Sequence, residues 1–148
     1  FLPNLAGPGK MSSSGDAPNV LLTDDRETVV EKMRTHAYSG GQSSVEAHRK
    51  QGGDPSVDVP FLLLQYFFEA DDERLERLAR EYREGSLLSG ELKDVAAEQV
   101  ADFLEAHQER RAALGPLEEE LPPFRLTERE RAAARRRVGY PDDALGER

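Results

Sequence analysis

Residues 58–68 read D-V-P-F-L-L-L-Q-Y-F-F, and within them Gln65 alone interrupts the apolar segment Phe61–Phe68. Asp58 and Pro60 are typical of a helix start, because an aspartate can cap the first free amides and proline fits the first turn. A helix that is apolar on every side has no face for solvent. The run therefore predicts the central buried helix, with its aromatic residues in the core rather than exposed for stacking on bases.

Amphipathic helices are expected on both sides of this run, each opened by a capping residue and closed by glycine. Two helices precede the run and end at Ser39-Gly40-Gly41 and Gly52-Gly53, and two come after it and end at Gly85 and Gly115. The predicted caps are Asp24 with Glu27, Ser43 with Glu46, Asp71 or Asp72, and Ser89. The stripes expected to face the core are Val29, Val30, Met33 and Ala37, then Leu75, Leu78, Ala79 and Tyr82, then Leu92, Val95, Ala96, Val100, Phe103 and Leu104.

The first 22 residues contain proline and glycine at a density that forbids a helix and predicts a mobile loop. Residues 20–22 are either a short strand or an apolar anchor. No convincing hairpin pattern is present. The five helices therefore predict a mainly α fold, a helical bundle.

The composition limits the possible functions. The chain has 148 residues, enough for one domain with a core, and a formal net charge of -9. This charge argues against a protein that engulfs nucleic acid, so any RNA contact must be local. We expect no membrane span and no export signal. Without cysteine there are no disulfides or thiolate metal sites, and the cytoplasm is the expected location.

The C-terminal region has a different composition. Residues 116–126 are rich in glutamate and proline and are expected to form a linker. Thr127 with Glu130 is a third capping box, and it predicts a helix whose apolar side chains are alanines and Val138. Its arginines suggest an RNA-backbone patch, but neighbouring acidic residues offset most of their charge. We favour a solvated helix here.

Residues 10–14 read K-M-S-S-S and lie in a glycine-flanked loop. A lysine and hydroxyl groups in a flexible loop suit the negative charge of a leaving pyrophosphate. Such a loop needs a nucleotide-holding sheet ahead of it, and the sequence begins without methionine. We therefore expect the back part of a larger nucleotide-using enzyme.

K-M-S-S-S resembles the second signature of class I aminoacyl-tRNA synthetases, and the residues after it resemble the archaeal and eukaryotic tryptophan-tRNA ligases. The resemblance extends from about Phe1 to Leu114, with the motifs in the order and spacing of that family. The motifs are L-T-D at 22–24, H-A-Y-S-G-G at 36–41, H-R-K-Q-G-G at 48–53, D-V-P-F at 58–61, F-F-E-A-D-D at 67–72 and G-E-L-K at 90–93.

The resemblance implies two segments. Residues 1–24 would be the end of a Rossmann-type α/β catalytic domain, and 25–115 a helical domain that binds the tRNA anticodon. The linker of 116–126 and the arginine-rich helix and tail of 127–148 lie outside the resemblance and are expected from composition alone. A fragment of this kind is not expected to charge tRNA alone, because the other class I signature and the tryptophan pocket belong to the missing part.

The resemblance also implies the site residues and partners. Lys10 would be the catalytic residue, stabilising charge as the tryptophan carboxylate attacks ATP. The residues implied to bind ATP are Lys10, Met11, Ser12, Ser13 and Ser14, with Met11 more a packing residue than a ligand. The implied partners are ATP with its Mg²⁺, L-tryptophan and tRNA-Trp, and a homodimer is expected through the missing catalytic domain.

Alternatives to this interpretation are a tyrosine-tRNA ligase, which shares the architecture, a stand-alone RNA-binding helical module, and a bare helical scaffold. H-A-Y-S-G-G and the long block from D-V-P-F to G-E-L-K favour tryptophan over tyrosine. Ser39-Gly40-Gly41 resembles a phosphate cradle, but we favour a helix C-cap. The histidines His36, His48 and His107 are spaced too widely to predict a metal site, and we expect none. We expect His36 at a helix end and His107 partly buried in a helix.

Overall fold

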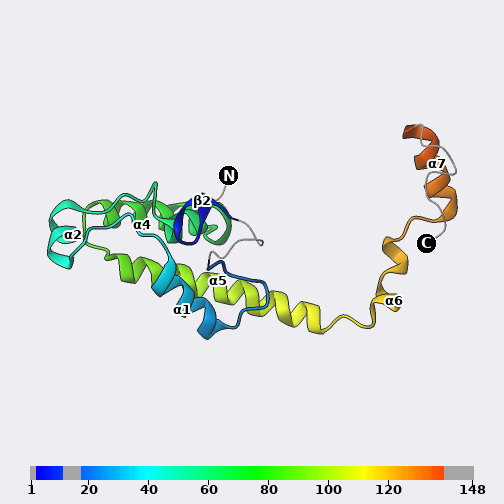
Figure 1. Ribbon diagram of the computed structural model, residues 1–148, viewed down its shortest axis with the longest axis horizontal. Coiled ribbons are helices and arrows are strands. Elements are labelled where there is room, and N and C mark those ends of the chain that lie inside the picture. Colours follow the sequence, from blue (N-terminus) through cyan, green and yellow to red (C-terminus); the bar gives the residue numbers. More distant parts are fainter. Residues whose placement is uncertain (1–2, 12–17, 139–148) are drawn as a thin grey trace. The chain divides into compact units, whose positions relative to one another are not determined.

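Helix α5, Ser89–Ala112, is the longest element of the protein's described part. The computed structural model describes residues 3–11 and 18–138 (Figure 1). These divide into a first unit that ends at Arg111 and a second that begins at Ala112. The other elements of the first unit are β1 (Pro3–Asn4), β2 (Gly7–Lys10), α1 (Arg26–His36), α2 (Val45–Gln51), α3 (Val59–Leu63), the π-helical turn η1 (Leu64–Phe68) and α4 (Asp72–Arg83). The predicted mainly α fold is confirmed.

The core of the first unit is formed by α1, α3, α4 and α5. Each predicted stripe contributes buried side chains, and three alanines of α5 add surface on which other elements can pack closely. The buried residues of these helices are Val29 and Met33 from α1, Val59, Pro60, Phe61 and Leu63 from α3, Leu78, Ala79 and Tyr82 from α4, and Leu92, Ala96, Ala97, Val100, Ala101 and Leu104 from α5. The buried side chains of the bundle therefore agree with the helical periodicity from which the bundle was predicted.

Helix α1 is tied to α5 by polar contacts as well. Arg26 pairs with Asp102 and Glu105, and Arg34 pairs with Asp94 at 2.7 Å. These pairs are exposed, so each adds little to stability. Gln108 donates from Nε2 to the carbonyl oxygens of Leu22 and Asp24, which holds the chain entering α1 against α5.

The helix starts differ slightly from the predicted caps. Asp25, not Asp24, caps α1 by accepting from the Thr28 amide at 2.8 Å, and Ser44, not Ser43, caps α2. Asp58 and Asp71 cap α3 and α4 as predicted. Ser89 is the first helical residue of α5, and its hydroxyl contacts Tyr82 instead of serving as the cap.

The expected C-cap at Ser39-Gly40-Gly41 is wrong. α1 ends at His36, and Ala37 is its C-cap. The glycines are needed for close packing instead: a Cβ on Gly40 would lie 2.0 Å from the Asp54 carbonyl oxygen, and one on Gly41 would lie 2.1 Å from Ser89 Oγ. The loop after α1 is therefore pressed against two other segments.

The apolar run does not form one buried helix. It divides into α3 and η1, where the Glu69 amide donates to the Leu64 carbonyl at 2.9 Å in the wider π-helical pattern. This wider turn keeps Leu64 buried but leaves Tyr66 and Phe67 60% and 64% exposed. The prediction that all the aromatics lie in the core is therefore wrong for these two.

The hairpin of β1 and β2 is another correction, because the sequence pattern predicted none. β1 and β2 pair antiparallel, with Pro3 opposite Lys10. The turn is anchored to the bundle because Leu5 is buried and its carbonyl accepts from the Tyr38 amide at 2.8 Å. Strands this short have no alternating side-chain pattern, so the pairing left no signal of the usual kind in the sequence.

The second unit contains α6 (Leu117–Glu120), the 3-10 turn η2 (Pro122–Phe124) and α7 (Glu128–Val138). The third capping box is confirmed, because Glu130 Oε2 accepts from the amide and hydroxyl of Thr127. Phe124 is 84% exposed. In neither unit does a helix of the described residues have the length and apolarity needed to cross a membrane.

Candidate functional site

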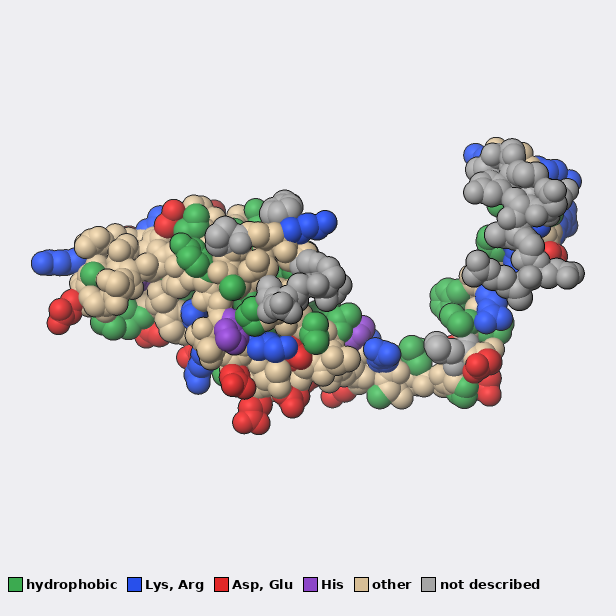
Figure 2. Space-filling view, in the orientation of Figure 1, with side chains coloured by type: hydrophobic (Ala, Val, Ile, Leu, Met, Phe, Trp, Pro, Cys, Tyr) green, Lys and Arg blue, Asp and Glu red, His purple; other side chains and the backbone are tan. Residues whose placement is uncertain are grey.

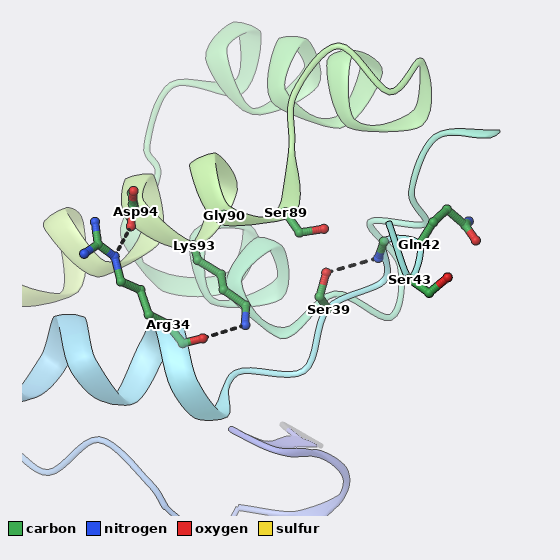
Figure 3. A pocket seen from close by; sticks show the side chains of 9 residues that line it. Arg34, Ser39, Gln42, Ser43, Ser89, Gly90, Lys93 and Asp94 are labelled. Carbon is green, nitrogen blue, oxygen red and sulfur yellow. Dashed lines mark hydrogen bonds and ion pairs between the residues drawn. The ribbon is translucent and has the colours of Figure 1, made fainter. Parts of the chain in front are cut away.

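A polar hollow of about 530 Å³ lies between the end of α1, the loop after it and the first turns of α5 (Figure 3). Glycine backbone and short polar side chains form much of its wall, with a few charged groups at the side. Its lining residues are Arg34, Ser39, Gly41, Gln42, Ser43, Ser89, Gly90, Lys93 and Asp94. Such a wall can form hydrogen bonds with a small polar ligand, and its short side chains let the ligand come close to the backbone.

A buried carboxylate holds the loop side of the polar hollow. Asp58 is 1% exposed, and its Oδ2 accepts from the Gly40 amide at 2.9 Å and from the Tyr82 hydroxyl at 2.8 Å. Its Oδ1 accepts from the Phe61 amide at 3.0 Å. Burial raises the pKa of Asp58, and these donors oppose that effect. Three donors converging on two oxygens indicate an ionised carboxylate.

Tyr82 connects the two walls of the polar hollow. Its hydroxyl lies 2.9 Å from Ser39 Oγ in the loop and 3.0 Å from Ser89 Oγ at the start of α5. The ring is fully buried, and burial raises the pKa of Tyr82 to about 12. The phenol therefore stays protonated and fixes the separation of the two serines.

The charged groups of the polar hollow come from α1 and α5. Arg34 is paired with Asp94, and the Lys93 ammonium donates to the Arg34 carbonyl at 3.0 Å (Figure 3). Partial burial lowers the pKa of Lys93. Because an ammonium has three donors, Lys93 can bind a further acceptor without breaking this bond.

His48 lies behind the same loop. It is 3% exposed, its Nε2 is 2.9 Å from the Leu87 carbonyl oxygen, and Nδ1 has no hydrogen-bond partner in the described structure. Since a carbonyl can only accept, the proton of a neutral ring must be on Nε2, and Nδ1 then carries a lone pair. His48 also lines an adjoining hollow of about 560 Å³ that shares Gln42, Ser43, Ser89, Gly90 and Asp94 with the polar hollow.

Two sequence motifs line the polar hollow, and two others lie behind its loop wall. H-A-Y-S-G-G supplies Ser39 and Gly41, and G-E-L-K supplies Gly90 and Lys93. H-R-K-Q-G-G supplies His48, and D-V-P-F supplies the carboxylate that holds the loop. No single motif has a metal-binding or nucleophile pattern, so only the fold reveals that they form one site.

Of the lysine–serine loop, residues 10–14, the structure describes only Lys10 and Met11. Lys10 is the exposed last residue of β2, and neither Lys10 nor Met11 lines the polar hollow. Ser12, Ser13 and Ser14 lie outside the described residues. Met11 instead lines an apolar hollow of about 240 Å³, together with Leu5, Val20, Leu21, Leu22, Leu63, Phe67, Phe68, Val100, Phe103 and Leu104. This contact fits a packing role for Met11.

The histidines occupy different environments. His36 is the exposed last residue of α1, as expected, while His48 is buried. His107 is half-buried on α5 and stacks on Phe103, which agrees with the expected partly buried position. Among the described residues, no three histidine, aspartate or glutamate side chains are grouped so that they could hold a metal ion.

The family model for tRNA synthetases class I (W and Y) matches residues 1–105. The chain therefore belongs to this family of class I synthetases, and the family resemblance of its motifs is confirmed.

The similar proteins are named as tryptophan enzymes. The chain is 61% identical over 140 residues to tryptophan--tRNA ligase 2 of Halobacterium salinarum, covering 95% of this chain and 37% of that protein. It is 51% identical over 112 residues to the tryptophan--tRNA ligase of Saccharolobus solfataricus, covering 75% and 30%. The tryptophanyl-tRNA synthetase structure from Giardia lamblia superposes with a TM-score of 0.79 at 35% identity, covering 88% and 32%. The chain thus spans about a third of the length of these relatives.

Proposed function

We propose that this chain is part of an ATP-dependent tryptophan-tRNA ligase and supplies its lysine–serine loop and a helical tRNA-binding unit. The support is the family match, the tryptophan-specific names of the similar proteins and the meeting of two motifs at the polar hollow, with two more behind its loop wall. That meeting carries the proposal for RNA binding, because these motifs build one hydrogen-bonding site rather than scattered core positions.

The polar hollow suits one unstacked nucleotide of an RNA loop. Bases in loops can be splayed out and read along their edges by polar side chains, whereas paired bases cannot. The hydroxyls of Ser39 and Ser89 would meet a base edge, and the ammonium of Lys93 would meet a phosphate or a sugar hydroxyl. We therefore place the recognition of an anticodon-loop nucleotide here.

The surrounding charge restricts how RNA can approach. Acidic side chains gather over α1 and α5 in Figure 2, on a chain whose net charge is -9. An RNA backbone is repelled by such a surface, so broad electrostatic adhesion is disfavoured. A local hydrogen-bonding hollow is then the more effective way to hold a loop.

Lys10 would act in the activation of tryptophan. A carboxylate oxygen of tryptophan attacks the α-phosphorus of ATP, and the bond to pyrophosphate breaks as pyrophosphate leaves with the electron pair. The Lys10 ammonium would stabilise the charge that grows during this step, which lowers the barrier without tightening ground-state binding. Ser12, Ser13 and Ser14 would contact phosphate, and Mg²⁺ would accompany the triphosphate.

The complete enzyme would act on L-tryptophan, ATP and tRNA-Trp, and would form a homodimer through its catalytic domain. A cytoplasmic location is proposed because relatives from mouse and yeast are named as cytoplasmic ligases.

Tryptophan-dependent pyrophosphate exchange by the full-length enzyme tests this function. Replacing Lys10 with alanine should slow exchange by about 10² to 10³ fold, the scale of comparable electrostatic deletions. An unchanged rate would refute the role of Lys10, and exchange that depends on tyrosine instead would refute the amino acid.

A further inference from the structure

We propose that the polar hollow selects a base edge that donates hydrogen bonds, because Asp58 and Tyr82 orient the Ser39 and Ser89 hydroxyls so that only their acceptor lone pairs face the ligand. This inference rests on the proposed binding of an RNA nucleotide in the hollow. It adds the chemistry by which that nucleotide is chosen.

The inference depends on the number of protons available. The carboxylate of Asp58 can only accept, so the single proton of the Tyr82 hydroxyl points to Asp58 Oδ2 at 2.8 Å. The phenol oxygen is then left as an acceptor for the two serine hydroxyls at 2.9 and 3.0 Å. Each serine has one hydroxyl proton, and that proton is directed inward.

Any further hydrogen bond to these two serine hydroxyls must be one that their oxygens accept. Ser39 Oγ already accepts from the Gly41 amide at 3.1 Å, and it keeps one lone pair, while Ser89 Oγ keeps two. The Nδ1 of His48 also has no partner among the described residues, but it is buried behind Gly41 and does not face the ligand. The inner wall therefore offers the free lone pairs of the two serine oxygens.

An acceptor-rich wall distinguishes an exocyclic amino group from a carbonyl. The amino groups of cytosine and adenine donate, whereas uracil and hypoxanthine carry a carbonyl at the same ring position. A carbonyl placed against lone pairs makes no hydrogen bond and leaves desolvated acceptors unpaired, which is costly. A phosphate oxygen is rejected at this wall for the same reason.

Asp58 and Tyr82 are thus positioning residues, since they act on the ligand through the serines. Removing the Tyr82 hydroxyl takes away the acceptor that holds both serine protons. The serine hydroxyls can then rotate and donate to a carbonyl. Tyr82→Phe should therefore lower base discrimination more than it lowers affinity for RNA.

The test uses the full 148-residue chain and synthetic RNA hairpins that carry the tRNA-Trp anticodon loop. At each loop position an amino-bearing base is replaced by its carbonyl counterpart, cytosine by uracil or adenine by hypoxanthine, and binding is measured by fluorescence anisotropy at low salt. For the unmodified protein, the affinity at one loop position should be about tenfold higher for the amino-bearing base than for its carbonyl counterpart. Tyr82→Phe should reduce this ratio to about twofold.

The matched control is Tyr66→Phe, which removes the hydroxyl of an exposed tyrosine elsewhere on the unit. It should keep the full ratio. Should Tyr82→Phe fail to fold, Ser89→Ala takes its place: it removes one acceptor and should weaken binding of the amino form while leaving the carbonyl form unchanged.

The outcomes separate the two proposals. If the unmodified protein binds none of the hairpins, the proposed RNA-binding function fails and this inference fails with it. If hairpins bind but no position favours the amino form, or if neither Tyr82→Phe nor Ser89→Ala changes the ratio, the inference alone is overturned.

Discussion

Helix α5 borders two hollows of opposite character. Its first turns, with Ser89 and Lys93, line the polar hollow, and its later part, with Val100 and Leu104, lines the apolar hollow. The polar hollow depends on backbone positions and on hydrogen bonds with a defined direction, whereas the apolar hollow depends on side-chain volume. Substitutions should therefore have abrupt effects in the first and graded effects in the second.

The largest effect is expected where the loop of the polar hollow is pressed against its neighbours. In Gly40→Ala the new Cβ would stand 2.0 Å from the Asp54 carbonyl oxygen, so the backbone must move. We expect a loss of about 3 kcal/mol in the free energy of unfolding, measured in urea. Gly90→Ala is the control, because a Cβ there meets no atom within 4 Å. Equal losses for the two variants would contradict the close packing of the loop.

The next effect is expected at the buried carboxylate. Asp58→Ala leaves the Gly40 and Phe61 amides and the Tyr82 hydroxyl without their acceptor. We expect the free energy of unfolding to fall by about 2 kcal/mol. The unpaired donors are costly, but the variant no longer has to bury a charge. Thermal unfolding monitored by circular dichroism checks this value. The comparison breaks down if Asp58→Ala is as stable as the unmodified protein.

A smaller effect is expected in the apolar hollow. Phe103 is 47% exposed and contacts Phe68 edge to face, with the two ring centroids 5.5 Å apart. Because half of its surface is already in water, Phe103→Ala should cost only about 1 kcal/mol by urea unfolding. Phe124→Ala, at an 84% exposed residue of the second unit, should cost nothing measurable. A loss for Phe103→Ala as large as that for Gly40→Ala would remove the distinction between graded and abrupt effects.

The smallest effect is expected in the acid range, at the polar contact between Glu69, which follows η1, and Gln99 of α5. The pKa of Glu69 is lowered from its ordinary 4.5, chiefly by the hydrogen bond from Gln99 and further by the Asp71 amide and Arg74. The unfolded state therefore binds this proton first as pH falls. The stabilisation is present above pH 4.5 and is lost as pH falls through the lower folded-state pKa.

Glu69→Gln should make stability fall less steeply with decreasing pH, measured as the unfolding midpoint at a series of pH values. Glu76→Gln, which removes an exposed charge from α4, should leave the slope unchanged. An identical slope in the unmodified protein and in Glu69→Gln would show that Glu69 makes no contribution in acid.

The helical architecture could be predicted because it depends on local patterns. Periodicity marked the stripes of α1, α4 and α5, and the starts of α1 and α2 were missed by one residue, since neighbouring aspartates or serines compete for the cap. The hairpin was missed because its pairing is between backbone groups. The exposure of Tyr66 and Phe67 was missed because hydrophobicity alone does not distinguish an α-helical from a π-helical turn.

The polar hollow was harder to predict than the fold. The pattern around Asp58 indicates a helix cap, which it is, but its second oxygen binds a loop that is distant in sequence. The pattern around Tyr82 indicates an apolar stripe, and its ring is indeed buried, but its hydroxyl joins two serines from different segments. A pattern reports one role per residue, and these residues have two.

At the π-helical turn η1, the number of residues in the chain determines which way the aromatic side chains point. A π-helical turn accommodates one residue more than an α-helical turn. Deleting one residue from 64–68 would restore an ordinary helix and rotate every later side chain around the axis, so that Phe67 and Phe68 would point to new neighbours. Insertions and deletions in this short segment, and not only substitutions, can therefore alter the aromatic wall of the apolar hollow.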